Sequence, residues 1–246
     1  PKTAANLKPA DVIVPYSPDN PPDLVIFDND GVLIDSEHLA GVADAQVLGE
    51  YGIDISADEA VERFIGLGPK NMQAEFAKLG IPLTKEYEYK VWHVLRDRIH
   101  SELKAIDGVI DLIRAIKAAN IPVCVCSNAP EQWLTTSHRI VGLDAVLSAP
   151  HYFHRDLVEH PKPAPDLHLL ALDSFGVAAN RALVIEDSSV GAMGAVAAGI
   201  PVFGFTGASG VPKTRSEQLM DVGCQQTLAS MVDVGELLLG TAYQGK

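Results

Sequence analysis

Residues 23–37 read DLVIFDNDGVLIDSE, an apolar run that ends abruptly at two aspartates and a glycine. The run from Leu24 to Phe27 lacks the polar alternation of a half-exposed strand, which is typical of a parallel strand buried on both faces. Asp28 and Asp30 follow at once, at the carboxyl end of that strand. Because open α/β sheets bind their ligands at this edge, the segment predicts both a fold class and the place of a site.

Three more short apolar runs repeat this pattern, at Val123 to Cys126, Ala182 to Ile185 and Val202 to Phe205. Helical patterns lie between them, at Gly108 to Asn120 and, beginning at a proline, at Pro165 to Phe175. Alternating strands and helices are typical of a parallel sheet with right-handed crossovers and helices on both faces. The sequence therefore predicts an α/β fold with a Rossmann-like core.

The stretch from Ser36 to Lys104 interrupts this alternation, because it contains helical patterns without a convincing strand. Four helices are predicted there, at residues 37–51, 57–65, 70–79 and 85–103. We therefore predict three parts: a Pro-rich N-terminal arm at 1–22, a core formed by 23–36 and 105–246, and an inserted all-helical cap domain at 37–104. The cap would cover the ends of the strands.

The charge and composition exclude several classes of partner. The chain has 246 residues, with 19 Lys and Arg against 32 Asp and Glu, so its formal net charge is −13. An acidic surface repels nucleic-acid backbones and anionic membranes, and no local basic patch offsets it. No apolar run reaches the ~18 residues of a membrane helix, and three cysteines are too few for a disulfide scaffold. We expect a cytoplasmic monomer without nucleic-acid or membrane partners.

Polar residues also follow the second and third predicted strands. Ser127 and Asn128 come after the second strand, and Glu186 and Asp187 after the third. If the strands are parallel neighbours, these two carboxylates meet those of the first motif at one edge, where their mutual repulsion requires a positive charge. Mg²⁺ suits a site that combines a few carboxylates with phosphate oxygens, so a magnesium site is predicted here.

A second positive charge is available from Lys162, in the loop HPKPAPD at 160–166. The hydroxyl of Ser127 and the amide of Asn128 are suitable donors to phosphoryl oxygens. Together these residues contain the parts needed to stabilise a transferring phosphoryl group electrostatically.

This set of motifs resembles that of the haloacid dehalogenase-like hydrolase superfamily, in its phosphatase and phosphoglucomutase-like branch with a small α-helical cap. The resemblance spans roughly residues 23–210 and is carried, in order, by DNDGVLIDSE at 28–37, Ser127-Asn128, Lys162-Pro163 and Glu186-Asp187. A lone D-x-D is common by chance, whereas four strand-end motifs in this order are specific. The second aspartate implies phosphoryl transfer, since the dehalogenases that name the superfamily lack it.

The resemblance implies a role for each catalytic residue. Asp28 would be the nucleophile that forms an aspartyl-phosphate, and Asp30 would be the general acid and later the general base. Ser127 and Lys162 would hold and neutralise the phosphoryl oxygens.

The resemblance also implies the cofactor and the substrate contacts. Mg²⁺ would be bound by the Asp28 carboxylate, the Asp30 backbone carbonyl and Asp187, with Glu186 as a further ligand or close neighbour. Substrate contacts are predicted at four residues: Asn128, Glu37, His38 and Lys70.

The predicted function is a Mg²⁺-dependent phosphatase that acts on a small phosphorylated metabolite, with sugar or polyol phosphates favoured. The alternative is a phosphosugar mutase that resembles β-phosphoglucomutase. Against it, the mutase histidine in the first cap helix corresponds to Ala40, and its phosphate-binding arginine corresponds to Pro69, although the adjacent Lys70 is a possible substitute. A third hypothesis is a catalytically silent binding protein, which would lack a catalytic residue, and none is missing here.

Other patterns receive structural interpretations. His151, His154 and His160 are predicted to lie in an irregular segment without a metal role, because their spacing is irregular. The small residues at 191–199 are predicted to pack a helix tightly on the sheet. The side chain of Asn29, between the two aspartates, is predicted to point away from the site if strand-like alternation continues.

Overall fold

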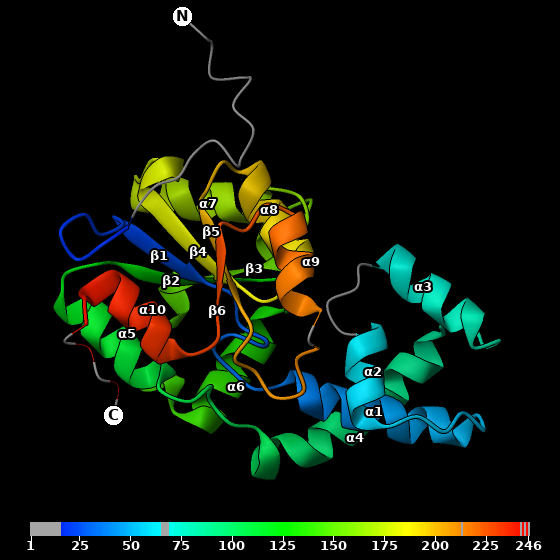
Figure 1. Ribbon diagram of the computed structural model, residues 1–246. Helices are drawn as coiled ribbons and strands as arrows, with labels where there is room; N and C mark the ends of the chain where they lie inside the picture. The colour runs from blue at the N-terminus through cyan, green and yellow to red at the C-terminus, as the bar shows by residue number, and fades with distance from the viewer. Residues whose placement is uncertain (1–15, 65–68, 213, 242, 244, 246) are drawn as a thin grey trace, which may run out of the picture.

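The computed structural model describes residues 16–241 apart from 65–68 and 213, together with 243 and 245. At its centre is a parallel sheet of six strands in the order β3-β2-β1-β4-β5-β6 (Figure 1). The strands are β1 Leu24–Phe27, β2 Val123–Ser127, β3 Tyr152–His154, β4 Ala182–Glu186, β5 Val202–Phe205 and β6 Gln226–Leu228. The predicted α/β fold with a Rossmann-like core is confirmed.

The four predicted strands are β1, β2, β4 and β5, and they occupy the middle of the sheet. The two edge strands, β3 and β6, were not predicted, because three residues are too few to reveal a pattern. The prediction of an irregular segment is therefore wrong for Tyr152–His154, which pairs in parallel with β2.

Helices cover both faces of the sheet, and alternate residues of each strand supply the two cores. Val25 and Phe27 of β1 pack with α5 Val109–Ala118, α6 Glu131–Val141 and α10 Met231–Leu239 on one face. Leu24 and Ile26 pack with α7 Asp166–Phe175, α8 Ser189–Ala197 and α9 Arg215–Asp221 on the other. All four side chains are fully buried, so burial on both faces explains the continuous apolar run.

The small residues at 191–199 form most of α8, as predicted. At Gly191, a Cβ atom would lie 1.9 Å from Glu186 Oε2, so no larger residue fits between this helix and the end of β4. The run of glycine and alanine thus places the helix close enough to bury the Glu186 side chain completely.

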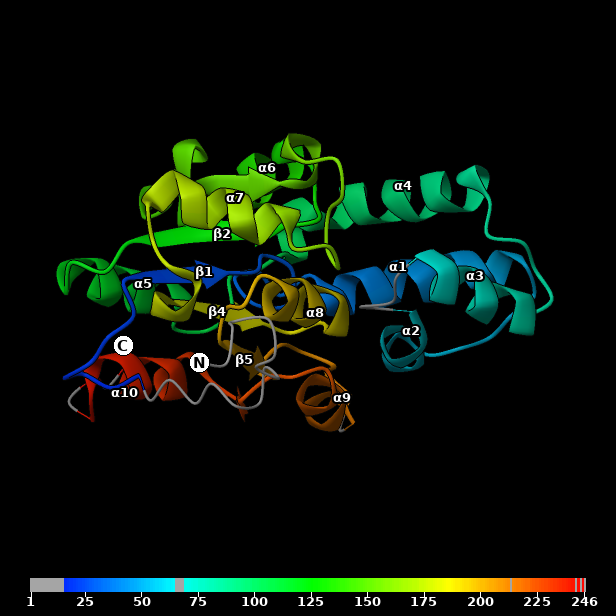
Figure 2. The ribbon, with the colours of Figure 1, turned by 90° about the horizontal axis from the view of Figure 1, so that it is seen from above.

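Among its described residues, the stretch between β1 and α5 contains four helices and no strand. It forms α1 Glu37–Glu50, α2 Ala57–Phe64, α3 Pro69–Lys78 and α4 Lys85–Glu102, in agreement with the predicted elements to within one or two residues. These helices have a small core of their own: Val47, Leu48, Ala60, Phe64, Phe76 and Tyr87. Figure 2 shows them beyond the carboxyl ends of the strands, the edge at which the motif residues end or follow β1, β2 and β4 in the sequence.

Part of the predicted N-terminal arm packs on the core. Tyr16 is 6% exposed, and its hydroxyl donates to the Ala182 carbonyl oxygen at 2.9 Å. Arg181 makes a bidentate ion pair with Asp23, the residue directly before β1. Residues 1–15 of the arm lie outside the described residues.

Candidate active site

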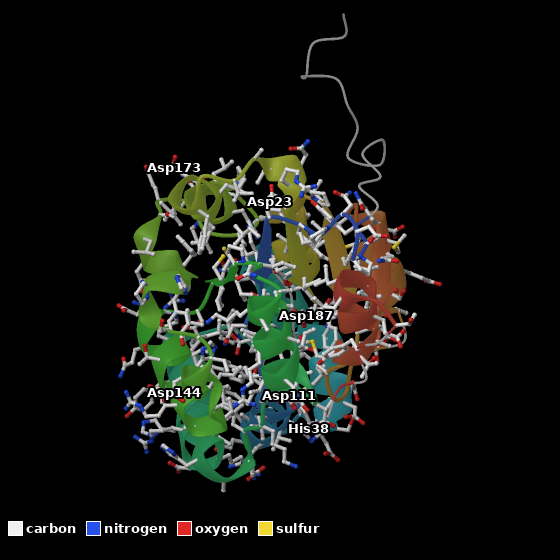
Figure 3. All side chains as sticks on the ribbon, turned by 90° about the vertical axis from the view of Figure 1, so that its left-hand side faces the viewer. Asp23, His38, Asp111, Asp144, Asp173 and Asp187 are labelled. Carbon is white, nitrogen blue, oxygen red and sulfur yellow. The ribbon has the colours of Figure 1, made fainter. Side chains whose placement is uncertain are left out.

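Three buried carboxylates meet where β1 and β4 end. The strands are paired in parallel with Phe27 opposite Ile185, so the next residues, Asp28 and Glu186, are brought together with Asp187. One carboxylate oxygen from each of the three lies within 4.8 Å of the others. Asp187 is 1% exposed, whereas Asp144 and Asp173, labelled with it in Figure 3, are exposed.

Lys162 supplies the positive charge that this cluster requires. Its Nζ is 2.7 Å from Asp28 Oδ1 and 2.8 Å from Glu186 Oε2, and the side chain is buried. Burial and the nearby Glu186 raise the pKa of Asp28 to about 7, although the lysine opposes them. Burial alone lowers the pKa of Lys162, but the two carboxylates outweigh it and hold that pKa above its ordinary value. The lysine is therefore charged at neutral pH.

The loop that carries Lys162 is held by Asn128. The Asn128 amide donates to the Lys162 carbonyl oxygen at 2.9 Å and accepts from the Lys162 backbone N–H at 2.9 Å. Both groups of this side chain are thus engaged in placing the lysine. Ser127 Oγ accepts a bond from the backbone N–H of Ala129 at 3.0 Å, which orients its hydroxyl at the end of β2.

One carboxylate oxygen of Asp187 has the surroundings of a cation ligand. Asp187 Oδ2 is buried and has no hydrogen-bond partner among the residues that the structure describes. Burial, Glu37 and Glu186 raise the pKa of Asp187 well above its ordinary value. Gly31, with φ +80°, passes so close that a Cβ there would lie 2.1 Å from this oxygen. The donor set consists of hard oxygens, so the residues fit a divalent cation such as Mg²⁺.

Glu37 and Arg215 form a second charged pair against the carboxylates. Glu37 begins α1, and its Oε1 lies 3.6 Å from Arg215 Nη1, with both side chains 4% exposed. The same nitrogen donates to the Asp187 backbone carbonyl at 2.8 Å. Sequence reasoning missed Arg215, because it stands in an ordinary polar stretch far from the four motifs.

Asp30 accepts three hydrogen bonds, two on one oxygen and one on the other. Ser36 Oγ donates to Oδ1 at 2.8 Å, and Trp133 Nε1 donates to the same oxygen at 2.9 Å. Asn29 Nδ2 donates to Oδ2 at 3.0 Å, so the Asn29 side chain contacts Asp30 although it is absent from the cavity wall. Sequence reasoning found neither contact: the one from Trp133 depends on how α6 packs, and the one from Asn29 on the side-chain orientation of a residue predicted to point away.

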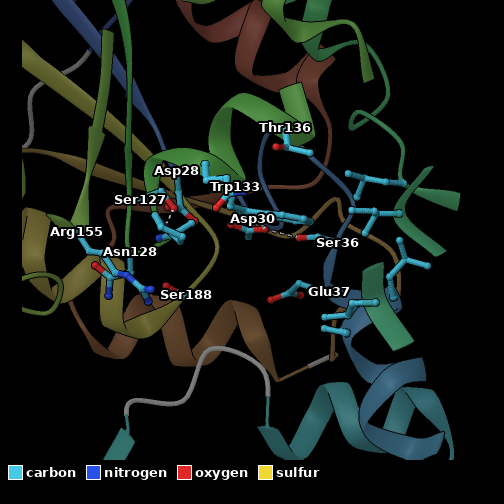
Figure 4. Close-up of a pocket in the computed structure, with 18 of the residues that line it drawn as sticks. Asp28, Asp30, Ser36, Glu37, Ser127, Asn128, Trp133, Thr136, Arg155 and Ser188 are labelled. Atoms are coloured by element: carbon cyan, nitrogen blue, oxygen red, sulfur yellow. Dashed lines mark hydrogen bonds between the residues drawn. The ribbon is translucent and has the colours of Figure 1, made fainter. Parts of the chain in front are cut away.

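A cavity of about 820 Å³ opens above these groups (Figure 4). In the figure, Asp28, Ser127 and Asn128 lie on one side, and Ser36 and Glu37 lie on the other. Much of the wall is apolar and comes from α4, from the residue that follows it and from α6: Trp92, Leu95, Ile99, Leu103 and Trp133. Two arginines, Arg96 and Arg155, also line it.

The predicted substrate-contact residues are distributed unevenly. Asn128 and Glu37 line the cavity, whereas His38 does not and lies 3.8 Å from Asp58 with its side chain 46% exposed. Lys70 belongs to α3, and its side chain lies outside the described residues. Ala40, the position that corresponds to the mutase histidine, is part of the cavity wall. Of the three histidines considered above, His154 ends β3 and lies 3.5 Å from Asp156.

The fold and the site define an α/β enzyme. Its site is a cluster of buried carboxylates, paired with a lysine and able to bind a cation, at the carboxyl ends of parallel strands. Residues 25–205 match the family model of haloacid dehalogenase-like hydrolases. The chain belongs to this family, which confirms the resemblance seen in its motifs.

Three similar proteins support this assignment. The 6-phosphogluconate phosphatase of Escherichia coli K12 is 32% identical over 189 residues, which cover 74% of this chain and 81% of that protein. A solved haloacid dehalogenase-like protein of unknown function from Agrobacterium tumefaciens C58 is 37% identical, with a TM-score of 0.80 and 89% of this chain and 99% of that one covered.

The third is a solved hydrolase of the same family from Deinococcus radiodurans R1, with bound phosphate and sodium. It is 27% identical, with a TM-score of 0.75 and 89% and 99% of the two chains covered. In the described part of this chain, no helix is long and apolar enough to cross a membrane.

Proposed function

We propose that this protein is a Mg²⁺-dependent phosphatase that hydrolyses a small phosphorylated metabolite, with sugar or polyol phosphates favoured, through an aspartyl-phosphate. The reaction class, hydrolysis of a phosphoric monoester, agrees with its family and with the phosphatase among its relatives. The observation that carries the proposal is the buried trio of Asp28, Glu186 and Asp187 with Lys162 against two of its members.

In the first step, an oxygen of Asp28 attacks phosphorus and the bond from phosphorus to the ester oxygen breaks. Asp30 gives its proton to the departing oxygen, which leaves as the alcohol. In the second step, Asp30 takes a proton from a water molecule, whose oxygen attacks the phosphorus of the aspartyl-phosphate. The acyl phosphate bond breaks, which returns the Asp28 carboxylate and releases inorganic phosphate.

The surrounding residues hold the phosphoryl group during both steps. Lys162 and the Ser127 hydroxyl stabilise the negative charge that spreads over its oxygens, and Asn128 keeps the lysine in place. The cation would be held by the carboxylates of Asp28 and Asp187, with Glu186 beside them, and when bound it supplies further charge stabilisation to the transferring group.

The helices of residues 37–104 act in this proposal as a cap domain that closes over the substrate and excludes water. Much of the cavity wall contributed by α4 and α6 is apolar, which suits a site that must be dry during phosphoryl transfer. The cavity volume of about 820 Å³ is large enough for a monosaccharide or polyol phosphate but not for a macromolecule.

The mutase alternative requires a group in the cap that activates a sugar hydroxyl. Ala40 lines the cavity with a methyl group, which has no acid or base function. The phosphatase is therefore the better-supported activity, and the products distinguish the two. A mutase would convert a sugar 1-phosphate to its isomer when a bisphosphate is present, whereas a phosphatase releases inorganic phosphate.

The test is phosphate release from a panel of sugar, polyol and nucleotide monophosphates, with Mg²⁺ and with a chelator. Asp28→Asn preserves the shape of the side chain but removes the nucleophilic carboxylate, so it serves as the blank. We expect Mg²⁺-dependent release that the variant loses while its melting temperature stays at or above that of the wild type. Full activity in Asp28→Asn would refute the proposal.

A further inference from the structure

A line of buried hydrogen-bonding groups runs from β3 to Asp30. The Tyr152 hydroxyl lies 2.7 Å from His138 Nδ1, and His138 Nε2 lies 2.7 Å from Asn29 Oδ1. The Asn29 amide nitrogen then donates to Asp30 Oδ2 at 3.0 Å. Asn29 and His138 are fully buried and Tyr152 is 6% exposed, so bulk water does not interrupt the line.

The direction of the protons along this line follows from the last bond. The Asn29 amide nitrogen, which can only donate, faces Asp30 Oδ2, and its amide oxygen, which can only accept, faces His138 Nε2. His138 Nε2 must then carry a proton, and Nδ1, as the remaining acceptor, receives the Tyr152 hydroxyl. The same hydroxyl lies 3.3 Å from the Leu147 carbonyl, a longer distance than its 2.7 Å to His138.

Every donor in this line therefore points toward Asp30. Hydrogen bonds arranged in this way polarise one another, so the bond that reaches Asp30 Oδ2 is stronger than an isolated amide contact. The arrangement requires a neutral imidazole, and burial lowers the pKa of His138 to about 4. The ring is also fixed in orientation by an edge-on contact with Tyr152 at 4.9 Å and 87°.

We propose that His138 and Tyr152, acting through Asn29, are positioning residues that aim the Asp30 carboxyl group at the leaving oxygen. This inference rests on the proposed function, because it assigns to Asp30 the transfer of a proton to the departing alcohol. Ser36 and Trp133 donate hydrogen bonds to Asp30 Oδ1, whereas this line ends in a hydrogen bond to Asp30 Oδ2. The two sets together fix the plane of the Asp30 carboxyl group.

The leaving group provides a readout that a purely structural role would not change. An alkyl alcohol must be protonated as it leaves, whereas p-nitrophenolate is a stable anion that departs without a proton. Loss of the line is therefore expected to lower kcat/KM about tenfold or more for the best sugar or polyol phosphate, and by less than about threefold for p-nitrophenyl phosphate.

Three variants make the comparison. His138→Leu removes both ring nitrogens, while His138→Gln offers an amide N–H toward Asn29 and an amide oxygen toward Tyr152, and is expected to recover most of the loss. Ser137→Ala is the matched control, since Ser137 is equally buried on the same helix but donates to the backbone carbonyls of Trp133 at 2.7 Å and Leu134 at 3.3 Å, within its own helix. Equal losses on both esters in His138→Leu, without recovery in His138→Gln, would overturn the positioning role.

A measurement that does not depend on activity tests the proton order. Nitrogen NMR of the His138 ring in the wild-type protein should report a neutral imidazole protonated at Nε2. A proton at Nδ1 would reverse the line and overturn the inference even if the phosphatase is active. If the wild-type protein hydrolyses no ester, the proposed function fails. The positioning role of His138 and Tyr152 then fails as well, because Asp30 has no proton to transfer. In that case an Nε2 proton seen by NMR describes a structural feature only.

Discussion

The coupling between Mg²⁺ binding and pH offers a quantitative test of the buried carboxylate site. The pKa of Asp28 is raised from 3.8 to about 7 in the folded protein. Between these values the folded protein keeps a proton that the unfolded chain has released, so the stability of the cation-free protein falls as the pH rises through this window. A cation competes with that proton, because only the carboxylate is a ligand.

The magnitude follows from the difference in pH. At about pH 8, Mg²⁺ at roughly 100 times its Kd stabilises the fold by about 2.7 kcal/mol, which raises the melting temperature of a chain of this size by about 5–10 °C. At about pH 5.5, 1.5 units below the pKa of Asp28, the proton weakens binding about thirtyfold. The same Mg²⁺ concentration then contributes about 0.8 kcal/mol, or about 2–3 °C.

The assay is thermal unfolding with chelator and with Mg²⁺ at both pH values. At each pH, the difference in melting temperature between the Mg²⁺ sample and the chelator sample cancels the pH-dependent contributions of groups that do not contact the cation. Asp187→Asn removes a predicted ligand and its charge, and should eliminate the Mg²⁺ effect at both pH values. An equal Mg²⁺ shift at pH 5.5 and pH 8, or a full shift in Asp187→Asn, would refute the assignment of the site.

Three further predictions concern single residues. Gly31→Ala places a Cβ 2.1 Å from Asp187 Oδ2 at φ +80°, so it should lower the melting temperature by several degrees and weaken Mg²⁺ stabilisation. Gly52→Ala has a similar φ of +77° without a neighbour within 4 Å and should show only the smaller backbone penalty in the same melts. Lys162→Met leaves two buried carboxylates without their counter-charge and should cost about 3–5 kcal/mol in urea unfolding at pH 8, with partial recovery at pH 5, where Asp28 is protonated. Lys117→Met, whose lysine donates to the Val146 carbonyl, should cost much less, and equal losses would contradict the ion-pair argument. The pKa of His138 is lowered from 6.5 to about 4 in the folded protein. Between these pH values the unfolded chain binds a proton that the folded protein does not, so about 3 kcal/mol of stability should be lost as the pH falls through this range. His138→Gln should remove that part of the pH dependence of urea unfolding, and an unchanged profile would show that the histidine is not buried in the neutral form.

The sequence by itself determined the fold class, the family and the motif residues of this protein. Four continuous apolar runs predicted the central strands, because burial on both faces removes the need for polar alternation. Residues that directly follow parallel neighbours must meet at one edge, so Asp28, Glu186 and Asp187 were grouped without any coordinates. The short edge strands β3 and β6 carry too few residues for such a pattern, which is why they were missed.

Only the tertiary structure decided which side chains surround those motifs. Trp133 reaches Asp30 because α6, which packs against β3 and α4, brings it there, and Arg215 reaches Glu37 because the start of α9 lies near the start of α1. The contact between Asn29 and His138 joins residues 109 positions apart. Such contacts depend on the angle and depth at which helices pack on the sheet, and a residue's own neighbours in the chain contain no record of that packing.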